Sequence, residues 1–292
     1  MDVVITYVDG NDPVWKKDYE KYTNVPVMEK RFRDWGTLKY LLRGIEKYMP
    51  FVNNVFLVVS HPSQVPEWVD AETLKVVLHK DFIPESLLPT FNCNPIEMHI
   101  HRIEGLGDEF IYFNDDLFPI SESKPEDFFR DGKAVLGFSR HIFASGMFKQ
   151  ICRNSDRAAR RLLSMPKSIR FIRPQHSCQP MYKSVNAHVY SQLKDEILGS
   201  MTRTRTAANL NQYLYLDYAY YNGRMIPERI SCTHFSVAVT SASKLSSFID
   251  NPYRKFLCIN DVRLGEEKFL QMQSAVIQAF EKKFPAKSRF EL

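Results

Sequence analysis

The stretch "EFIYFNDD" (109–116) decides the fold class, because an unbroken apolar run leads directly into an amide and two carboxylates. Such a run is typical of a strand that is buried on both faces of a parallel sheet. Asn114, Asp115 and Asp116 stand where that strand would end. Ligands of parallel α/β sheets bind beyond the carboxyl ends of the strands, so this tip predicts a functional site.

The sequence before it alternates between strand-like and helix-like segments. "DVVITYV" (2–8), "NVFLVVS" (54–60) and "LKVVLH" (74–79) are rich in β-branched and apolar residues. "WGTLKYLLRGIEKYM" (35–49) carries apolar residues at helical spacing, and "NPIEMHIHRI" (94–103) predicts another helix with Asn94 as its N-cap. This alternation predicts a Rossmann-like (GT-A-like) α/β fold, a mostly parallel sheet flanked by helices.

The second half of the chain is richer in helix-like sequence. "DRAARRLLSM" (156–165) and "NLNQYLYLDYAYYN" (209–222) both lie between about residues 140 and 225. We therefore expect a single domain over 1–292 with a helical insertion or subdomain at approximately 140–225 that covers the edge of the sheet.

Composition narrows the class of protein. Of the 292 residues, 44% are hydrophobic and 25% are charged, as in an ordinary soluble globular enzyme. The chain has no apolar stretch long enough for a transmembrane helix, and "MDVVITYVDG" (1–10) lacks the features of a signal peptide, so we expect a cytoplasmic protein. The five cysteines form no CxxC pair, which favours reduced, packed thiols over disulfides or a zinc ribbon.

The net charge of +5 is partly concentrated between Arg153 and Arg173, where seven basic residues accompany one acid, Asp156. Such a cluster suits phosphate or an anionic membrane surface, and a solvated basic face is an equal alternative. No DNA- or RNA-binding signature accompanies it, so we expect no nucleic-acid partner.

Paired carboxylates indicate where a cation or a proton could be held. Asp9 and Asp12 follow the first expected strand, as Asp115 and Asp116 follow the later one. Carboxylates at strand ends suit a hard divalent cation, and one of them could instead accept a proton from an attacking hydroxyl. A polar turn that caps a helix is the alternative.

Further polar residues occur in three separate segments. Glu97 and His101 are one helical turn apart and should share a face that lines a site, whereas the HExxH pattern of a zinc hydrolase is absent. "RPQHSCQP" (173–180) holds His176, and "RTRTAANLNQ" (203–212) holds Arg203 and Arg205. A histidine and an arginine directed at one anion would stabilise charge on phosphoryl oxygens. "FLCINDVRL" (256–264) repeats the apolar lead into an amide and a carboxylate.

On these segments the chain resembles the Stealth family of sugar-phosphate transferases, which includes bacterial capsular polysaccharide phosphotransferases. Four family regions are similar to residues 2–15, to 31–59 with 79–118, to 175–183 with 205–221, and to 255–262. The chain departs from the family at Trp35 and Gly36, and at Cys178, where a proline is usual.

The resemblance implies a UDP-sugar donor, transfer of a sugar-1-phosphate to a glycan hydroxyl, release of UMP, and Mg²⁺ or Mn²⁺ as cofactor. It implies catalytic roles for Glu97, Asp116, His176 and Arg205, with Arg203 as the alternative to Arg205. The metal ligands that it implies are Asp115, Asp116 and Asp261; whether Asp116 is a base or a ligand stays open. The substrate-binding residues that it implies are Asp2, Asp9, Gly10, Asp12, Arg31, Asp34, His101, Arg102, Asn114 and Asn260.

The bacterial branch further implies a lipid-linked glycan acceptor and peripheral contact with the inner face of the plasma membrane. Two other functions compete with this one. A metal-dependent glycosyltransferase would transfer the sugar alone and release UDP, with much the same sheet and metal. A non-catalytic scaffold for polysaccharide or lipid gives no reason for acids, histidine and arginine to recur at strand ends.

Overall fold

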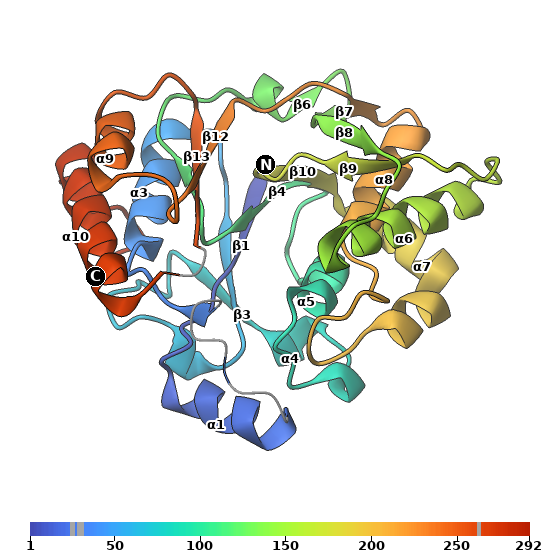
Figure 1. Cartoon of the computed structure of the whole chain (residues 1–292), viewed down its shortest axis with the longest axis horizontal. Helices are drawn as coiled ribbons and strands as arrows, with labels where there is room; N and C mark the ends of the chain where they lie inside the picture. Colours follow the sequence, from blue (N-terminus) through green and yellow to red (C-terminus); the bar gives the residue numbers. More distant parts are fainter. Residues whose placement is uncertain (24–26, 28–31, 262–263) are drawn as a thin grey trace.

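The computed structural model describes residues 1–292 except 24–26, 28–31 and 262–263. Its centre is a five-stranded sheet with the order β10-β4-β1-β2-β3 (Figure 1). These strands are β1 (Asp2–Thr6), β2 (Val55–Val59), β3 (Lys75–Leu78), β4 (Glu109–Asn114) and β10 (Gln179–Tyr182). All neighbours are parallel except β10, which runs antiparallel to β4. The expected Rossmann-like α/β class is confirmed.

The apolar runs form the innermost strands because both faces of the sheet are covered. Val4 pairs with Phe56 of β2 on one side and with Tyr112 of β4 on the other, and all three are buried. Helices lie on both sides of the sheet (Figure 1). On one side they are α3 (Leu38–Tyr48), α9 (Ala242–Asp250) and α10 (Glu266–Lys283). On the other they are α4 (His79–Phe82), α5 (Cys93–His99), α6 (Met147–Leu162), α7 (Lys183–Ser200) and α8 (Tyr213–Tyr221); α1 (Pro13–Tyr22) lies below the sheet.

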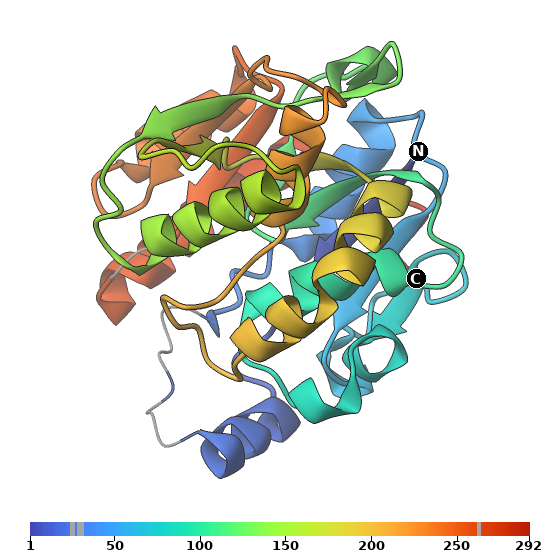
Figure 2. The ribbon, with the colours of Figure 1, turned by 90° about the vertical axis from the view of Figure 1, so that its right-hand side faces the viewer.

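The segment between about 140 and 225 supplies α6, α7 and α8, and α6 and α7 lie in front of the sheet in Figure 2. These helices share a hydrophobic cluster that includes Val189, Leu214 and Tyr215 and reaches Met98 of α5. The same segment also supplies β10, so it forms one edge of the central sheet as well as a helical layer. The subdomain boundaries expected there stay a prediction.

Three small sheets accompany the central sheet, and two of them, those with β5 and β13 and with β9, reach its carboxyl edge. Their strands are β5 (Leu117–Pro119), β12 (Cys232–Ser236) and β13 (Phe256–Asn260); β6 (Phe129–Arg130), β7 (Lys133–Val135) and β11 (Met225–Ile226); and β8 (Phe138–His141) with β9 (Phe171–Pro174). β13 pairs with β5, and Ile259 N donates to Asp116 O at 2.9 Å. This pairing places the end of β13 beside the end of β4.

The N-cap of α5 and the search for membrane-spanning helices both bear on the expectations from the sequence. The N-cap of α5 is Asn92 and not Asn94, because Asn92 Oδ1 accepts from Asn94 N at 3.1 Å. Among the described residues, no helix combines the length and apolarity needed to cross a membrane.

Candidate active site

A cleft of about 560 Å³ opens at the carboxyl edge of the central sheet. Its walls come from the ends of β1, β4 and β13, from α5, from the segment after β9 and from the segment before α8. It collects many of the residues that sequence reasoning selected: Asp34, Glu97, Asn114, Asp115, Asp116, His176, Arg205, Asn260 and Asp261.

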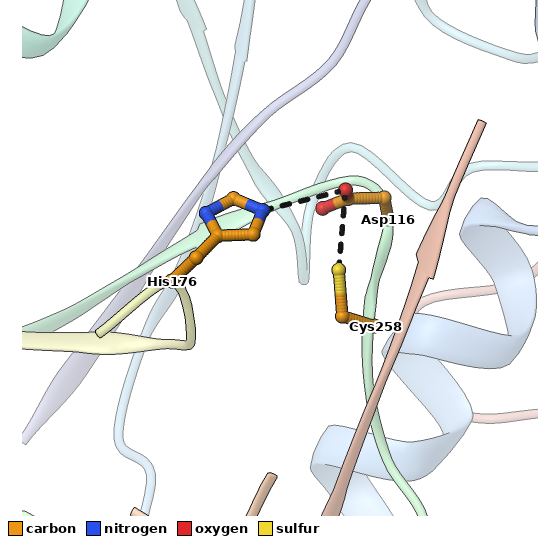
Figure 3. A group of neighbouring side chains, drawn as sticks. All are labelled: Asp116, His176 and Cys258. Atoms are coloured by element: carbon orange, nitrogen blue, oxygen red, sulfur yellow. Dashed lines mark hydrogen bonds and ion pairs between the residues drawn. The ribbon is translucent and has the colours of Figure 1, made fainter. Parts of the chain in front are cut away.

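Asp116 forms the first polar group of the cleft (Figure 3). His176 Nε2 lies 3.7 Å from Asp116 Oδ2, and Cys258 Sγ donates to the same oxygen at 3.5 Å. Burial by itself would lower the pKa of His176, but the hydrogen bond and the negative charge of Asp116 outweigh it and raise that pKa. A raised pKa favours the imidazolium form, which places a positive charge in the cleft.

Asp115 and Asp34 make this wall strongly acidic. Burial, followed by the negative charges of Asp116 and Asp34, raises the pKa of Asp115 to about 8. Asp116 Oδ1 is buried and has no hydrogen-bond partner among the described residues. Crowded carboxylates with an unsatisfied oxygen fit a hard divalent cation, whose ligands are oxygens. Asp115 and Asp116 are therefore the residues that could hold one.

Glu97 and Arg205 form a second polar group, of opposite charges. Glu97 Oε1 lies 3.4 Å from the hydroxyl of Tyr112, and Glu97 Oε2 is buried without a partner in the described structure. Burial raises the pKa of Glu97, and the charge of Arg205 partly offsets that effect. Arg205 Nη2 donates to Cys93 Sγ at 2.6 Å, while its Nε finds no partner among the described residues. Both side chains thus have polar atoms available to a ligand.

Comparisons with known proteins identify the family of this chain. A family model described as Stealth protein CR2, conserved region 2, matches residues 31–136. The capsular polysaccharide phosphotransferase WcwK of Streptococcus pneumoniae is 31% identical over 330 residues, an alignment that covers 100% of this chain and 98% of the relative. The chain belongs to the Stealth family. It is therefore an enzyme that transfers a phosphate-containing group.

Other relatives and one solved structure show weaker similarity. The receptor polysaccharide phosphotransferase WefC of Streptococcus oralis is 29% identical over 100% of this chain and 99% of its own length. The capsular polysaccharide phosphotransferase cps1A of Actinobacillus pleuropneumoniae is 30% identical over 93% of this chain and 78% of its own length. The galactosyltransferase LgtC, solved with donor and acceptor sugar analogs, has a TM-score of 0.42 and 11% identity over 94% of this chain and 96% of its own. That last similarity is too remote to support an inference.

Four of the residues that the family resemblance assigned to substrate binding, all in the first family region, do not line the cleft. Asp2 is at the opposite, amino end of β1, where its carboxylate accepts from Asn54 N at 3.2 Å and from Gly107 N at 2.8 Å. Asp12 caps α1 by accepting from Trp15 N at 2.7 Å. The carboxylates of Asp2 and Asp12 therefore accept hydrogen bonds from backbone N–H groups. Asp9 and Gly10 occupy the turn between β1 and α1, where Asp9 Oδ1 accepts from Asn11 N at 2.8 Å and a Cβ on Gly10 would lie 2.4 Å from Phe32 O.

His101 and Arg102 also lie away from the cleft. α5 ends at His99, and residues 100–102 continue as a 3₁₀ turn, which has three residues per turn. The side chain one turn after Glu97 is therefore rotated, and His101 packs 4.8 Å from Tyr190 of α7 instead of beside Glu97. The expected shared face of Glu97 and His101 is wrong for this reason. Arg102 is exposed, and Arg31 lies outside the described residues.

Only one of the two candidate arginines lines the cleft. Arg205 lines the cleft, whereas Arg203 is exposed and donates to Leu88 O at 3.2 Å. Sequence reasoning missed Arg173, which belongs to β9, lines the cleft and lies 5.1 Å from the Phe148 ring. Its position three residues before His176 was the available signal, because both belong to one constrained segment.

Proposed function

We propose that this Stealth enzyme transfers a hexose-1-phosphate or N-acetylhexosamine-1-phosphate from a UDP-sugar to a glycan hydroxyl. The reaction would release UMP and form a phosphodiester in a capsular, exopolysaccharide or cell-wall polysaccharide. The observation that carries the proposal is the charge arrangement of the cleft, in which His176 lies 3.7 Å from Asp116 while Arg205, which donates to Cys93 Sγ, lines the same cleft as Glu97. Phosphoryl transfer needs mainly positioning and cations for the transferring oxygens, and this arrangement supplies both.

In this mechanism the acceptor hydroxyl attacks the β-phosphorus and UMP leaves with the bridging oxygen. Asp116 accepts the hydroxyl proton, because its carboxylate is oriented by His176 and Cys258. Arg205 and protonated His176 stabilise the negative charge on the equatorial phosphoryl oxygens. Arg173 adds a third cation on the same wall.

The proposed cofactor is Mg²⁺ or Mn²⁺. Asp115 and the free oxygen of Asp116 would hold it, with Asp261 at the end of β13 as the third expected ligand. When bound, such an ion would neutralise charge on the leaving phosphate. The residues of the chain itself bind the donor, orient the acceptor and move the proton.

The decisive experiment identifies the nucleotide that purified protein releases from a panel of UDP-sugars with Mg²⁺ and glycan acceptors. We expect UMP. UDP would mean that the sugar moves alone, as in the competing metal-dependent glycosyltransferase, and would refute the proposal. Asp116→Asn, His176→Ala and Arg205→Ala should each lower kcat by about 100-fold or more, whereas the exposed neighbour Arg203→Ala should stay near wild type.

We propose a lipid-linked acceptor at the inner face of the plasma membrane, and one surface supports it. Phe143 is 80% exposed and Ile169 78% exposed, although both are large and apolar. Phe143 follows His141 by two residues and Ile169 precedes Phe171 by two, and His141 pairs with Phe171 at the end of the β8–β9 ladder. The exposed basic residues around them are Arg140, Lys167 and Arg170. Apolar side chains among cations suit an anionic lipid surface.

This lipid-facing surface differs in part from the basic cluster of the sequence. Arg160 pairs with Asp156 at 2.9 Å, Arg161 pairs with Glu196, and Arg173 faces the cleft. Co-sedimentation with phosphatidylserine vesicles should fall for Phe143→Glu. A matched control is Val239→Glu, since Val239 is 87% exposed at another place in the chain. Equal binding of the two variants would refute the surface.

A further inference from the structure

Three chemically different donor atoms converge at the wall of the cleft (Figure 3). They are Asp116 Oδ2, His176 Nε2 and Cys258 Sγ, and all lie within 4.8 Å of one another. Each comes from a different segment: the turn after β4, the loop between β9 and β10, and the middle of β13. Three side chains from separate segments converge only where the fold holds each segment in place.

The two separations from Asp116 Oδ2 are close to those of ligands around a tetrahedral Zn²⁺. Bond lengths of about 2.0–2.1 Å to nitrogen or oxygen and about 2.3 Å to sulfur give ligand–ligand distances of about 3.3–3.6 Å in a tetrahedron. The sulfur–oxygen distance is 3.5 Å and the nitrogen–oxygen distance is 3.7 Å. Along these two contacts, a movement of only a few tenths of an ångström would close the group on the ion.

The identity of the donors selects the ion. Mg²⁺ and Mn²⁺ prefer carboxylate, carbonyl and water oxygens, whereas a set of sulfur, nitrogen and oxygen is typical of Zn²⁺. The two oxygens of Asp116 thus face different surroundings. Oδ1 has no partner among the described residues, and Oδ2 faces His176 and Cys258.

We propose that Asp116, His176 and Cys258 form a binding site for Zn²⁺, and that Zn²⁺ bound there inhibits the enzyme. The Cys258 thiol releases its proton to solvent when the sulfur binds the ion, and His176 binds in its neutral form. The fourth position faces the cleft, which both Asp116 and His176 line. Occupied in this way, Asp116 can no longer accept a proton and His176 can no longer bind the phosphoryl oxygens.

Binding is tested without any assay of transfer, by adding Co²⁺ to the metal-free enzyme as a spectroscopic substitute for Zn²⁺. We expect a thiolate-to-metal charge-transfer band in the near ultraviolet that is displaced by Zn²⁺. Cys258→Ser should abolish the band, and His176→Gln should weaken the affinity for Co²⁺ by about tenfold or more. Cys152→Ala is the matched control, because Cys152 is a buried thiol in α6 outside the group, and it should keep the band.

The inhibitory part rests on the proposed function and is measured separately. Zn²⁺ added against excess Mg²⁺ should inhibit transfer, and the concentration for half-inhibition should rise by about tenfold or more in Cys258→Ser, relative to that variant's own uninhibited rate. A wild-type enzyme without the band, or a folded Cys258→Ser variant that retains it, refutes the site. A band with no accompanying inhibition refutes the inhibitory role alone. If no transfer is found with any UDP-sugar, the proposed function fails, and the cobalt spectrum still decides whether the site exists.

Discussion

Tyr112→Phe removes one buried hydroxyl that contacts three residues of the candidate active site. That hydroxyl lies 2.7 Å from Asn114 Oδ1, 2.9 Å from Thr6 Oγ1 and 3.4 Å from Glu97 Oε1, and Tyr112 is 1% exposed. It therefore links the ends of β1 and β4 to Glu97 on α5. The substitution keeps the ring and its packing, so it isolates the contribution of these hydrogen bonds.

The expected losses of stability and of turnover follow from the polar groups that the substitution leaves without a hydrogen-bond partner. Loss of a buried hydrogen-bond partner costs about 1–3 kcal/mol, so the free energy of unfolding should fall by about that amount. Glu97 Oε2 has no hydrogen-bond partner among the described residues, so loss of the contact between Tyr112 and Oε1 should also let the side chain shift. A displacement of about 1 Å in an active site costs about 100-fold in rate, and we expect kcat to fall by roughly 10- to 100-fold. KM for the donor should change much less, since Tyr112 is not among the residues that line the cleft.

Tyr40→Phe is the matched control. Tyr40 is equally buried, and its hydroxyl donates to Glu281 Oε1 of α10 at 3.1 Å, outside the cleft. Urea unfolding and steady-state UMP release would be measured for both variants. Tyr40→Phe should lose stability and keep its turnover. A Tyr112→Phe enzyme that turns over within about twofold of wild type would refute the positioning of Glu97 through this hydroxyl.

Three further predictions concern pH, metal and stability. Burial lowers the pKa of His101 from its ordinary value of 6.5 to about 3, so below about pH 6.5 the unfolded chain binds a proton that the folded chain does not, and the free energy of unfolding falls. In His101→Phe, the slope of the free energy of unfolding against pH, measured with urea, should decrease by the equivalent of about one proton. Because the pKa of Asp115 is raised to about 8, the folded chain keeps a proton that the unfolded chain has lost, and stability declines as pH rises from about 4 to 8. Mg²⁺ should therefore raise Tm more at the upper end of that range. Asp115→Asn should remove most of this difference between high and low pH. Arg43 contacts Glu291 at 2.7 and 2.5 Å in a nearly buried pair, so Glu291→Gln should lower the free energy of unfolding by about 3 kcal/mol and leave KM unchanged.

The sheet and its carboxyl edge were predictable because they depend on local pattern. Apolar runs such as 55–59 and 110–113 are long enough to identify buried strands without any knowledge of their neighbours. Parallel pairing then places the carboxyl ends of β1 and β4 on one edge, which brings Thr6 and Asn114 into one cleft. His176 and Arg205 needed the family resemblance, since nothing local shows that loops about thirty residues apart meet.

The failures have specific physical causes. Asp2 looked like a site residue, but position along a strand matters: it starts β1, and only the other end of that strand reaches the cleft. The position of His101 depends on where α5 ends and the 3₁₀ turn begins, and the periodicity of the sequence does not show that point. Cys258 looked like an ordinary core thiol, and only its antiparallel pairing with Leu117 brings it beside Asp116.

The polar atoms that the fold leaves unsatisfied are themselves informative. Buried polar groups nearly always have partners, and each one without a partner costs about 1–3 kcal/mol. Asp116 Oδ1, Glu97 Oε2 and Arg205 Nε are buried without partners among the described residues, and all three belong to side chains that line one cleft. A fold selected for stability alone would replace them with apolar side chains of similar size. The charges of Asp116 and Arg205 instead suit a ligand with a cation opposite Asp116 and an anion opposite Arg205, which is the charge pattern of the metal-bound nucleotide-sugar that we propose as donor.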